Sequence, residues 1–219
     1  EEGEGIEVNG LMARAETYAK PIPDESIGVL CASADVQADR IEVLVNGYST
    51  NQIWVVGMQI FYGTPTSEEL WDKVEEYLRQ TWEHPSGQDL RITRAFIDSG
   101  YETGNVYNFC KKLEATGVCA IKGVGGMNRG EVGRPSKNNS ARCNVFPLGV
   151  NTLKTQVMVR LRVEDEQASG YIHFPDFLDE EFYLQLTSER LVKRYSKGIP
   201  RMEFKKMRAR NEALDLMTY

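Results

Sequence analysis

Three aspartates lie where the chain leaves one expected element for the next. Asp35 ends a strand-like run within IGVLCASADVQADRIEVLV (27–45), and Asp98 ends the run RITRAFID (91–98). Asp215 belongs to the late stretch RARNEALDLMTY. Aspartate is a poor strand former and is costly to bury unless it is paired or holds a cation. These positions make the three residues candidates for carboxylate chemistry with a divalent metal ion.

Asp39, four residues after Asp35, has a simpler explanation. It lies between two strand-like runs, where aspartate commonly forms turns. Asp35 fits that explanation less well, because it follows Cys31 and Ser33 on one face of its strand. Its position alone leaves two alternatives open, a surface aspartate or a functional carboxylate.

The pattern of apolar residues predicts an α/β domain. The expected elements are strands at 28–36, 40–48 and 53–62, a helix capped by Ser67 with apolar residues at helical spacing as far as Trp82, a strand at 91–98, a helix at about 102–116, and a strand at 117–123. Short links between the first three strands favour an antiparallel meander, and the later alternation favours parallel pairing.

This order of elements is that of the ribonuclease-H-like fold, in which helices flank a mixed central sheet. In that fold the first and fourth strands lie side by side and parallel. Asp35 and Asp98 each end one of these strands. The order therefore predicts a carboxylate pair at the carboxyl edge of the sheet, where open α/β sheets build their sites.

The late stretch supplies a third carboxylate. Glu212 and Asp215 are three residues apart, so on a helix they share one face, which Leu216 and Tyr219 flank with apolar surface. Exposed acidic residues in the first turns of a helix, favoured by the macrodipole, are the alternative. A ribonuclease-H-like nuclease requires a carboxylate from a late helix packed on the first strand, which favours Asp215 as a site residue.

Composition indicates an ordinary globular chain of 219 residues, 41% of them hydrophobic. Its apolar runs are far shorter than the roughly 18 residues of a membrane span, and its first ten residues do not resemble a secretion signal. The four cysteines form no CxxC pair and there are only two histidines, which argues against a zinc site and favours reduced thiols.

The net charge of −6 hides two basic segments. Residues 190–211 form one of them. The other, KGVGGMNRGEVGRPSKNNSAR (122–142), holds five basic residues against Glu131; they are Lys122, Arg129, Arg134, Lys137 and Arg142. This glycine-rich segment is either a solvated surface loop or a flexible loop that contacts phosphates.

Seven short stretches together resemble one family, the nuclease domain of phage terminase large subunits of the lambda type. They are, in family order, ADVQADRIEVLVNGY, AFIDSGYETGNVY, CAIKGVGG, GVNTLKTQV, GYIHFP, YLQLTSERLV and RNEALDLMTY. Terminases of this type join an N-terminal packaging ATPase to an endonuclease that cuts concatemeric viral DNA. No G-x-x-x-x-G-K-[ST] loop occurs in this sequence.

The resemblance implies a domain organisation and a set of partners. Residues 1–26 would be the remnant of a linker from an absent ATPase domain, and 27–219 the endonuclease domain. The partners would be double-stranded DNA, the ATPase domain in cis, the terminase small subunit and the capsid portal. The protein would act in the cytoplasm of the bacterial host, without a membrane.

The resemblance also implies a mechanism. Two divalent cations, Mg²⁺ or Mn²⁺, hydrolyse the phosphodiester bond by stabilising the attacking water and the leaving oxygen. Asp35 would bridge both ions, with Asp98 and Asp215 each binding one. Glu212 would be an auxiliary residue, and Lys122 would contact the scissile phosphate. The basic side chains Arg129, Arg134 and Lys137 would bind DNA.

Two alternatives remain open from the sequence. The domain could be a non-catalytic module that docks the packaging motor, with a vestigial acidic cluster. It could also be a transposase or junction-resolving nuclease on the same fold. Three intact carboxylates favour catalysis over docking, and the family stretches after residue 140 favour a terminase over a transposase.

Overall fold

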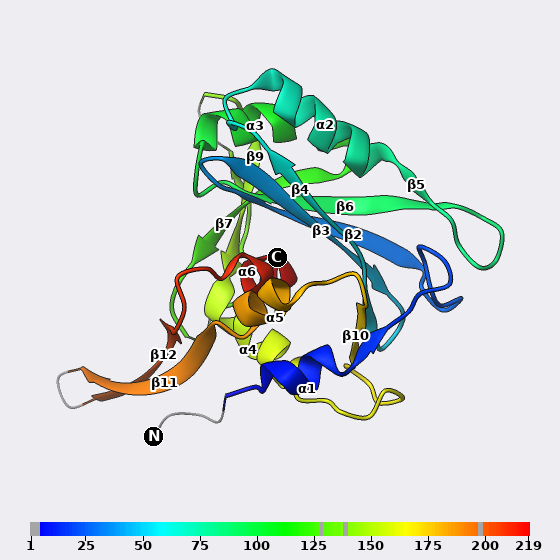
Figure 1. Cartoon of the computed structure of the whole chain (residues 1–219). Helices are drawn as coiled ribbons and strands as arrows, with labels where there is room; N and C mark the ends of the chain where they lie inside the picture. The colour runs from blue at the N-terminus through cyan, green and yellow to red at the C-terminus, as the bar shows by residue number, and fades with distance from the viewer. Residues whose placement is uncertain (1–4, 128, 138–139, 197–198) are drawn as a thin grey trace.

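The computed structural model describes residues 5–127, 129–137, 140–196 and 199–219 (Figure 1). The helices are α1 (Val8–Met12), α2 (Glu68–Arg79), α3 (Thr103–Lys112), α4 (Val150–Leu161), α5 (Glu180–Leu186) and α6 (Glu212–Thr218), with a 3-10 turn at Glu114–Thr116. The strands are β1 (Ala15–Glu16), β2 (Val29–Val36), β3 (Arg40–Tyr48), β4 (Ile53–Tyr62), β5 (Thr81–Trp82), β6 (Leu90–Asp98), β7 (Val118–Val124), β8 (Ser136–Lys137), β9 (Asn144–Gly149), β10 (Ile172–Pro175), β11 (Glu189–Ser196) and β12 (Ile199–Lys206).

The central sheet is mixed, as the sequence predicts. Its strand order is β1-β10-β4-β3-β2-β6-β7-β9-β8, with β5 paired to β6 at one end. Strands β2, β3 and β4 form the expected antiparallel meander. Strand β6 runs parallel to β2, and β7 parallel to β6, so the first and fourth predicted strands are neighbours. The predicted ribonuclease-H-like strand order is confirmed.

Alternating side chains of the central strands build a core on each face of the sheet. Helices α2 and α3 cover one face, while α4, α5 and α6 lie on the other (Figure 1). On β3, Val43 and Val45 enter the first core and Leu44 enters the second. The same alternation applies to β2, where Ala34 faces α2 and α3 while Ser33 and Asp35 face α6.

Two helix predictions are corrected at their ends. Helix α3, predicted at about 102–116, ends at Lys112, and a 3-10 turn at Glu114–Thr116 follows it. Helix α2 ends at Arg79, and Gln80 already has extended backbone. Trp82 therefore lies on β5, paired with Leu90, rather than on the helix. Trp82 is still buried, with its ring edge-on to Tyr77, so its apolar character was predicted correctly and its backbone conformation was not.

The segment 122–142 is partly ordered by the body of the protein. Its first residues continue β7, and β8 pairs with β9. The amide of Gly133 donates to the Pro147 carbonyl at 2.7 Å, and the amide of Gly149 donates to the Glu131 carbonyl at 2.9 Å. Asn128 and residues 138–139 lie outside the described residues. The described part of the segment is thus attached along β9 and is not a free loop.

The N-terminal segment packs onto the same domain. Leu11 enters the core beneath α5 and α6, Ile22 enters the opposite core, and β1 pairs with β10. None of the helices in the described residues has the length and apolar character needed to cross a membrane. All four cysteines are free, as expected for reduced thiols.

A two-stranded hairpin stands apart from the central sheet. It is formed by β11 and β12, which pair antiparallel and project from the body beside α4 (Figure 1). The sequence identified this segment as basic but did not predict its conformation.

Candidate active site

Asp35 and Asp98 lie at the carboxyl ends of neighbouring parallel strands. The register pairs Ala34 of β2 with Ile97 of β6, so the next residue of each strand is an aspartate. The negative charge of Asp98 adds to the rise in the pKa of Asp35 that burial causes. The two predicted carboxylates therefore lie at the same edge of the sheet.

Asp35 is a buried carboxylate, with 5% of its surface exposed. The Gln37 side-chain amide donates a hydrogen bond to Asp35 Oδ2. Burial raises the pKa of Asp35 to about 7; the Gln37 hydrogen bond opposes this rise, and repulsion from Asp98, Asp215 and Glu212 adds to it. This carboxyl group consequently holds a proton far more readily than an exposed aspartate.

Asp98 is held by the backbone that follows it. The amides of Gly100 and Ser99 donate to its carboxylate, at the turn that leads into α3. Burial raises the pKa of Asp98, as does the charge of Asp215, while these amides and the Lys122 ammonium group lower it. Lys122 is exposed on β7, so the structure places the predicted phosphate-contacting lysine near the pair.

Helix α6 brings Asp215 to the same edge. The buried hydroxyl group of Ser33 on β2 donates to the Leu216 carbonyl at 2.6 Å, which fixes the helix against the first central strand. Burial raises the pKa of Asp215, with the charge of Lys154 opposing it. Burial also raises the pKa of the neighbouring Tyr219, and repulsion from Asp215, Asp98 and Asp35 adds to this rise.

A buried polar network holds the Asp215 carboxylate. Lys154 of α4 is 7% exposed, and its Nζ lies 2.8 Å from Asp215 Oδ1 and 2.8 Å from Glu189 Oε1. The Asn211 amide donates to Glu189 Oε1 at 2.7 Å and to Asp215 Oδ2 at 2.9 Å. Burial lowers the pKa of Lys154, but the two carboxylates outweigh that effect and raise it. Both oxygens of Asp215 are thus fixed in direction.

Glu212 has a different set of partners from Asp215. Its oxygens accept from the guanidinium groups of Arg40 and Arg210, each at 3.3 Å. The same two arginines contact the buried Glu42, at 2.6 and 3.0 Å. Glu212 is therefore part of a salt-bridge cluster beside Asp35 and is not a free carboxylate. The auxiliary role of Glu212 stays a prediction.

Asp39 lies in the β2–β3 turn, as predicted. Its side chain is 70% exposed and forms a surface ion pair with Arg40 at 2.7 Å. The predicted DNA-binding residues Arg129, Arg134 and Lys137 are exposed. Arg129 donates to the Gly125 carbonyl at 2.7 Å, and Lys137 lies on β8. They belong to the segment beside β9, next to the strand that carries Lys122.

The donor set fits a hard divalent cation, because carboxylate oxygens are the ligands that Mg²⁺ and Mn²⁺ prefer. The ion pairs found among the described residues include neither Asp35 nor Asp98, although Asp35 is buried. Within the described part of the chain, no three His, Cys, Asp or Glu side chains form a ready metal cage. Asp215 instead contacts Lys154, which offsets the repulsion that three clustered carboxylates would otherwise experience.

The network residues Lys154, Glu189 and Asn211 were not singled out from the sequence. Each lies within a stretch that carries the family resemblance, namely GVNTLKTQV, YLQLTSERLV or RNEALDLMTY. The family resemblance of those stretches is therefore the feature of the sequence that could have identified these three residues. Their spacing along the chain gave no reason to join them, because the three residues come from α4, β11 and the residue before α6.

A ribonuclease-H-like sheet with acidic residues at the ends of its two central parallel strands, and a third on a late helix, defines a nuclease domain. The chain belongs to the family described as terminase large subunit gpA, endonuclease domain, whose model matches residues 1–219.

Individual proteins agree with this assignment. The chain is 30% identical to the terminase large subunit of Escherichia phage lambda over 99% of its own length, and 28% identical to that of Enterobacteria phage P21. It spans 35% of the length of each of these relatives. A solved mutant nuclease domain of the large terminase subunit of bacterial virus Sf6, with manganese, has a TM-score of 0.51 at 10% identity, covering 98% of this chain and 97% of that one. That likeness supports the fold.

Proposed function

We propose that this domain is a metal-dependent endodeoxyribonuclease that cuts concatemeric double-stranded DNA by a two-metal mechanism. The single observation that carries the proposal is that the pairing of β2 with β6 and the packing of α6 on β2 bring Asp35, Asp98 and Asp215 to the same end of the sheet. They come from β2, β6 and α6, which lie far apart in the sequence. A docking module would gain nothing from burying repelling carboxylates, since this costs stability unless a cation compensates.

Asp35, Asp98 and Asp215 would hold two divalent cations, Mg²⁺ or Mn²⁺. When bound, such ions activate a water and stabilise the leaving oxygen in phosphodiester hydrolysis. The central position of Asp35 suits it to bind both ions. The solved Sf6 domain with manganese gives independent support for a divalent ion.

The remaining residues orient these ligands and position the substrate. Lys154 and Asn211 fix the direction of the Asp215 carboxylate, as partners of metal ligands generally do. The amides of Ser99 and Gly100 do the same for Asp98. Lys122 is exposed beside Asp98, where its ammonium group could contact the scissile phosphate.

Arg129, Arg134 and Lys137 would bind the DNA backbone on the segment that follows Lys122. All three are exposed basic side chains. In the whole protein, an N-terminal ATPase domain, joined to this domain by residues 1–26 as linker, would bring DNA to the site together with a small subunit and a capsid portal. That assembly would act in the host cytoplasm.

A plasmid assay tests the proposal. The protein is incubated with supercoiled DNA and Mn²⁺ or Mg²⁺, with and without a chelator, alongside the Asp35→Asn and Asp39→Asn variants. We expect linear and nicked products with metal, no products with chelator or with Asp35→Asn, and normal cleavage by Asp39→Asn. Cleavage that survives the Asp35 substitution would contradict the proposed site. Absence of cleavage, combined with unchanged Mn²⁺-dependent melting in Asp35→Asn, would favour the docking module.

A further inference from the structure

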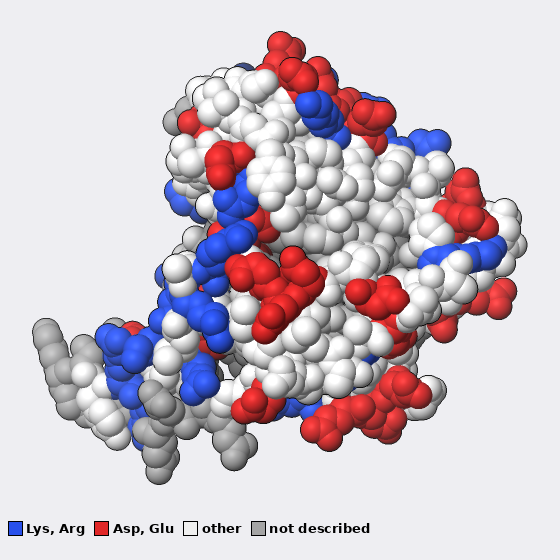
Figure 2. Space-filling view, viewed as in Figure 1, with Lys and Arg blue, Asp and Glu red and all other residues white. Residues whose placement is uncertain are grey.

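The β11–β12 hairpin concentrates positive charge in an acidic protein. Residues 189–206, which form the hairpin, contain seven basic and two acidic residues, a net charge of +5 in a chain of −6, so the rest of the chain carries −11. The exposed basic side chains among its described residues are Arg190, Lys193, Arg194, Lys205 and Lys206. Figure 2 shows basic residues gathering at this end of the molecule and acidic residues along the opposite lower edge. This local charge exceeds the +4 of the 122–142 segment.

The shape of the hairpin suits a duplex groove. Each strand has eight residues, so the arm is roughly 25 Å long at about 3.3 Å per residue. A two-stranded β-ribbon fits the major groove of B-DNA, which is about 12 Å wide. Tyr195 is 68% exposed, and the Lys193 ammonium group lies 5.7 Å from the centre of its ring. Cationic and aromatic groups side by side are typical of nucleic-acid contacts.

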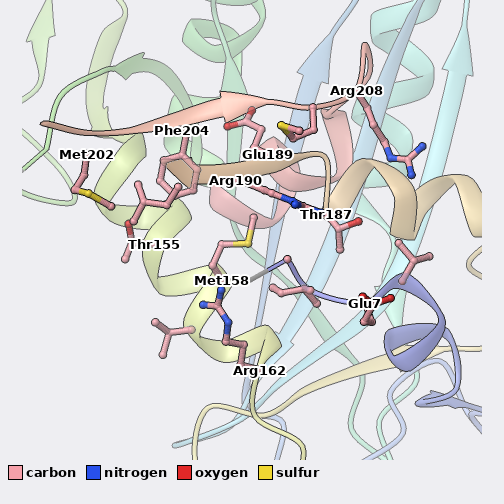
Figure 3. A pocket seen from close by; sticks show the side chains of 16 residues that line it. Glu7, Thr155, Met158, Arg162, Thr187, Glu189, Arg190, Met202, Phe204 and Arg208 are labelled. Atoms are coloured by element: carbon pink, nitrogen blue, oxygen red, sulfur yellow. The ribbon is translucent and has the colours of Figure 1, made fainter. Parts of the chain in front are cut away.

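The underside of the hairpin is its apolar face. Leu191 and Phe204 are paired across the two strands and point toward α4. A hollow of about 890 Å³ lies between this face and α4, with Met158 and Phe204 among the residues that line it (Figure 3). By strand alternation Lys193 lies farther along the same face, while Arg194 and Lys205 lie on the opposite face, and all three side chains are exposed.

The root of the hairpin adjoins the candidate active site. The Met207 amide donates to the Ser188 carbonyl at 2.7 Å and closes the root. Glu189, the first residue of β11, shares Lys154 and Asn211 with Asp215. The positive charge of Lys206, at the end of β12, lowers the pKa of Asp215. A polyanion held by the arm would consequently pass beside the carboxylates.

We propose that the β11–β12 hairpin is a second DNA-binding element. It contacts the phosphate backbone of a duplex next to the candidate active site, and it does so independently of the 122–142 segment. This inference rests on the proposed function, because it takes DNA as the substrate. The duplex is favoured over an acidic protein partner by the dimensions of the ribbon and by the position of its root beside the nuclease carboxylates.

The test is a salt titration of binding to a fluorescent 30-base-pair duplex in the presence of EDTA, so that no cleavage occurs. The test variant carries Lys193→Ala, Arg194→Ala and Lys205→Ala. A control variant with the same loss of charge carries Lys73→Ala, Arg79→Ala and Lys112→Ala on α2 and α3, which cover the other face of the sheet. At physiological salt, charges on that face are separated from the arm by more than the screening length of about 8 Å.

We expect the slope of log K against log salt to flatten by up to about 2.7 in the hairpin variant, at about 0.9 per lost phosphate contact. The control variant should keep the wild-type slope. Both variants should keep the wild-type melting temperature, since the replaced side chains are exposed.

An unchanged slope in the hairpin variant overturns the inference and leaves an acidic protein surface as the partner of the arm. The outcome is separable from that of the plasmid assay. If DNA binding depends on the hairpin but the protein never cuts DNA, the proposed nuclease function is refuted and the hairpin inference stands. If the protein cuts DNA with metal but binding does not depend on the hairpin, the nuclease function stands and the hairpin inference is refuted.

Discussion

Replacing Asp35 by asparagine should stabilise the metal-free protein at pH 8 while removing the proposed nuclease activity. The pKa of Asp35 is about 7 in the folded protein, against 3.8 for an ordinary aspartate. Between these values the folded state holds a proton that the unfolded state has lost. The carboxyl group therefore costs no stability below about pH 4, and its full cost is present above about pH 7.

The size of the effect follows from the shift. The rise in the pKa of Asp35 from 3.8 to about 7, at about 1.36 kcal/mol per pKa unit, corresponds to a cost of about 4 kcal/mol at pH 8. Asparagine has no charge to desolvate, and its side-chain oxygen can still accept from Gln37. For a chain of this size, about 4 kcal/mol corresponds to a rise in Tm of roughly 8 to 16 °C.

The assay is thermal melting of Asp35→Asn and wild type in EDTA at pH 4.5 and pH 8. Asp39→Asn is the matched control, because Asp39 lies in the turn after the same strand and is exposed. We expect a large stabilisation at pH 8, a much smaller one at pH 4.5, and almost none for the control at either pH. An Asp35→Asn protein that melts at or below the wild-type temperature at pH 8 would show that burial of this carboxylate carries no such cost.

Three further predictions concern the residues around the site. Because the Asp35 carboxyl group must lose its proton to bind a cation, Mn²⁺ affinity measured by titration calorimetry should rise about fivefold from pH 6 to pH 7 and level off above pH 8. Lys154→Met should lower the free energy of unfolding by about 3 to 5 kcal/mol in urea titrations, because it leaves Glu189 and Asp215 unpaired. The double variant Lys154→Met, Glu189→Gln should recover part of this loss. If it recovers none, the loss is not caused by the unpaired charges. Ser33→Ala should cost about 1 to 3 kcal/mol by leaving the buried carbonyl that accepts its hydrogen bond unsatisfied, and an unchanged urea midpoint would show that this bond contributes nothing.

Much of the fold and the carboxylate site could be predicted because both depend on the order of elements. Asp35 and Asp98 each follow an apolar strand, and parallel pairing of those strands brings their ends together regardless of side-chain detail. Asp215 required one further step, the packing of a late helix on the first strand. These inferences use periodicity and topology, which a single sequence carries.

The partners of the site could not be predicted in the same way. The Lys154–Glu189 contact joins residues 35 positions apart, and nothing in spacing or periodicity selects that pair from other lysines and glutamates. Trp82 shows the related limit of periodicity, because an apolar residue at helical spacing packs equally well from a short strand. The hairpin was missed as a structure because its high charge obscured the alternation of its apolar residues.

The hydrogen bond between Ser33 and Leu216 has a consequence for the order of folding. It joins residues 183 positions apart, and α6 has only seven residues, too few to be a stable helix in isolation. Contacts of such high sequence separation form slowly, because the intervening chain must first lose its conformational freedom. Asp215 would thus join Asp35 and Asp98 late, after the sheet has formed. A partly folded chain would present Asp35 and Asp98 without Asp215. The proposed nuclease activity would therefore be acquired only in the last cooperative step of folding. Detachment of α6 alone would abolish that activity.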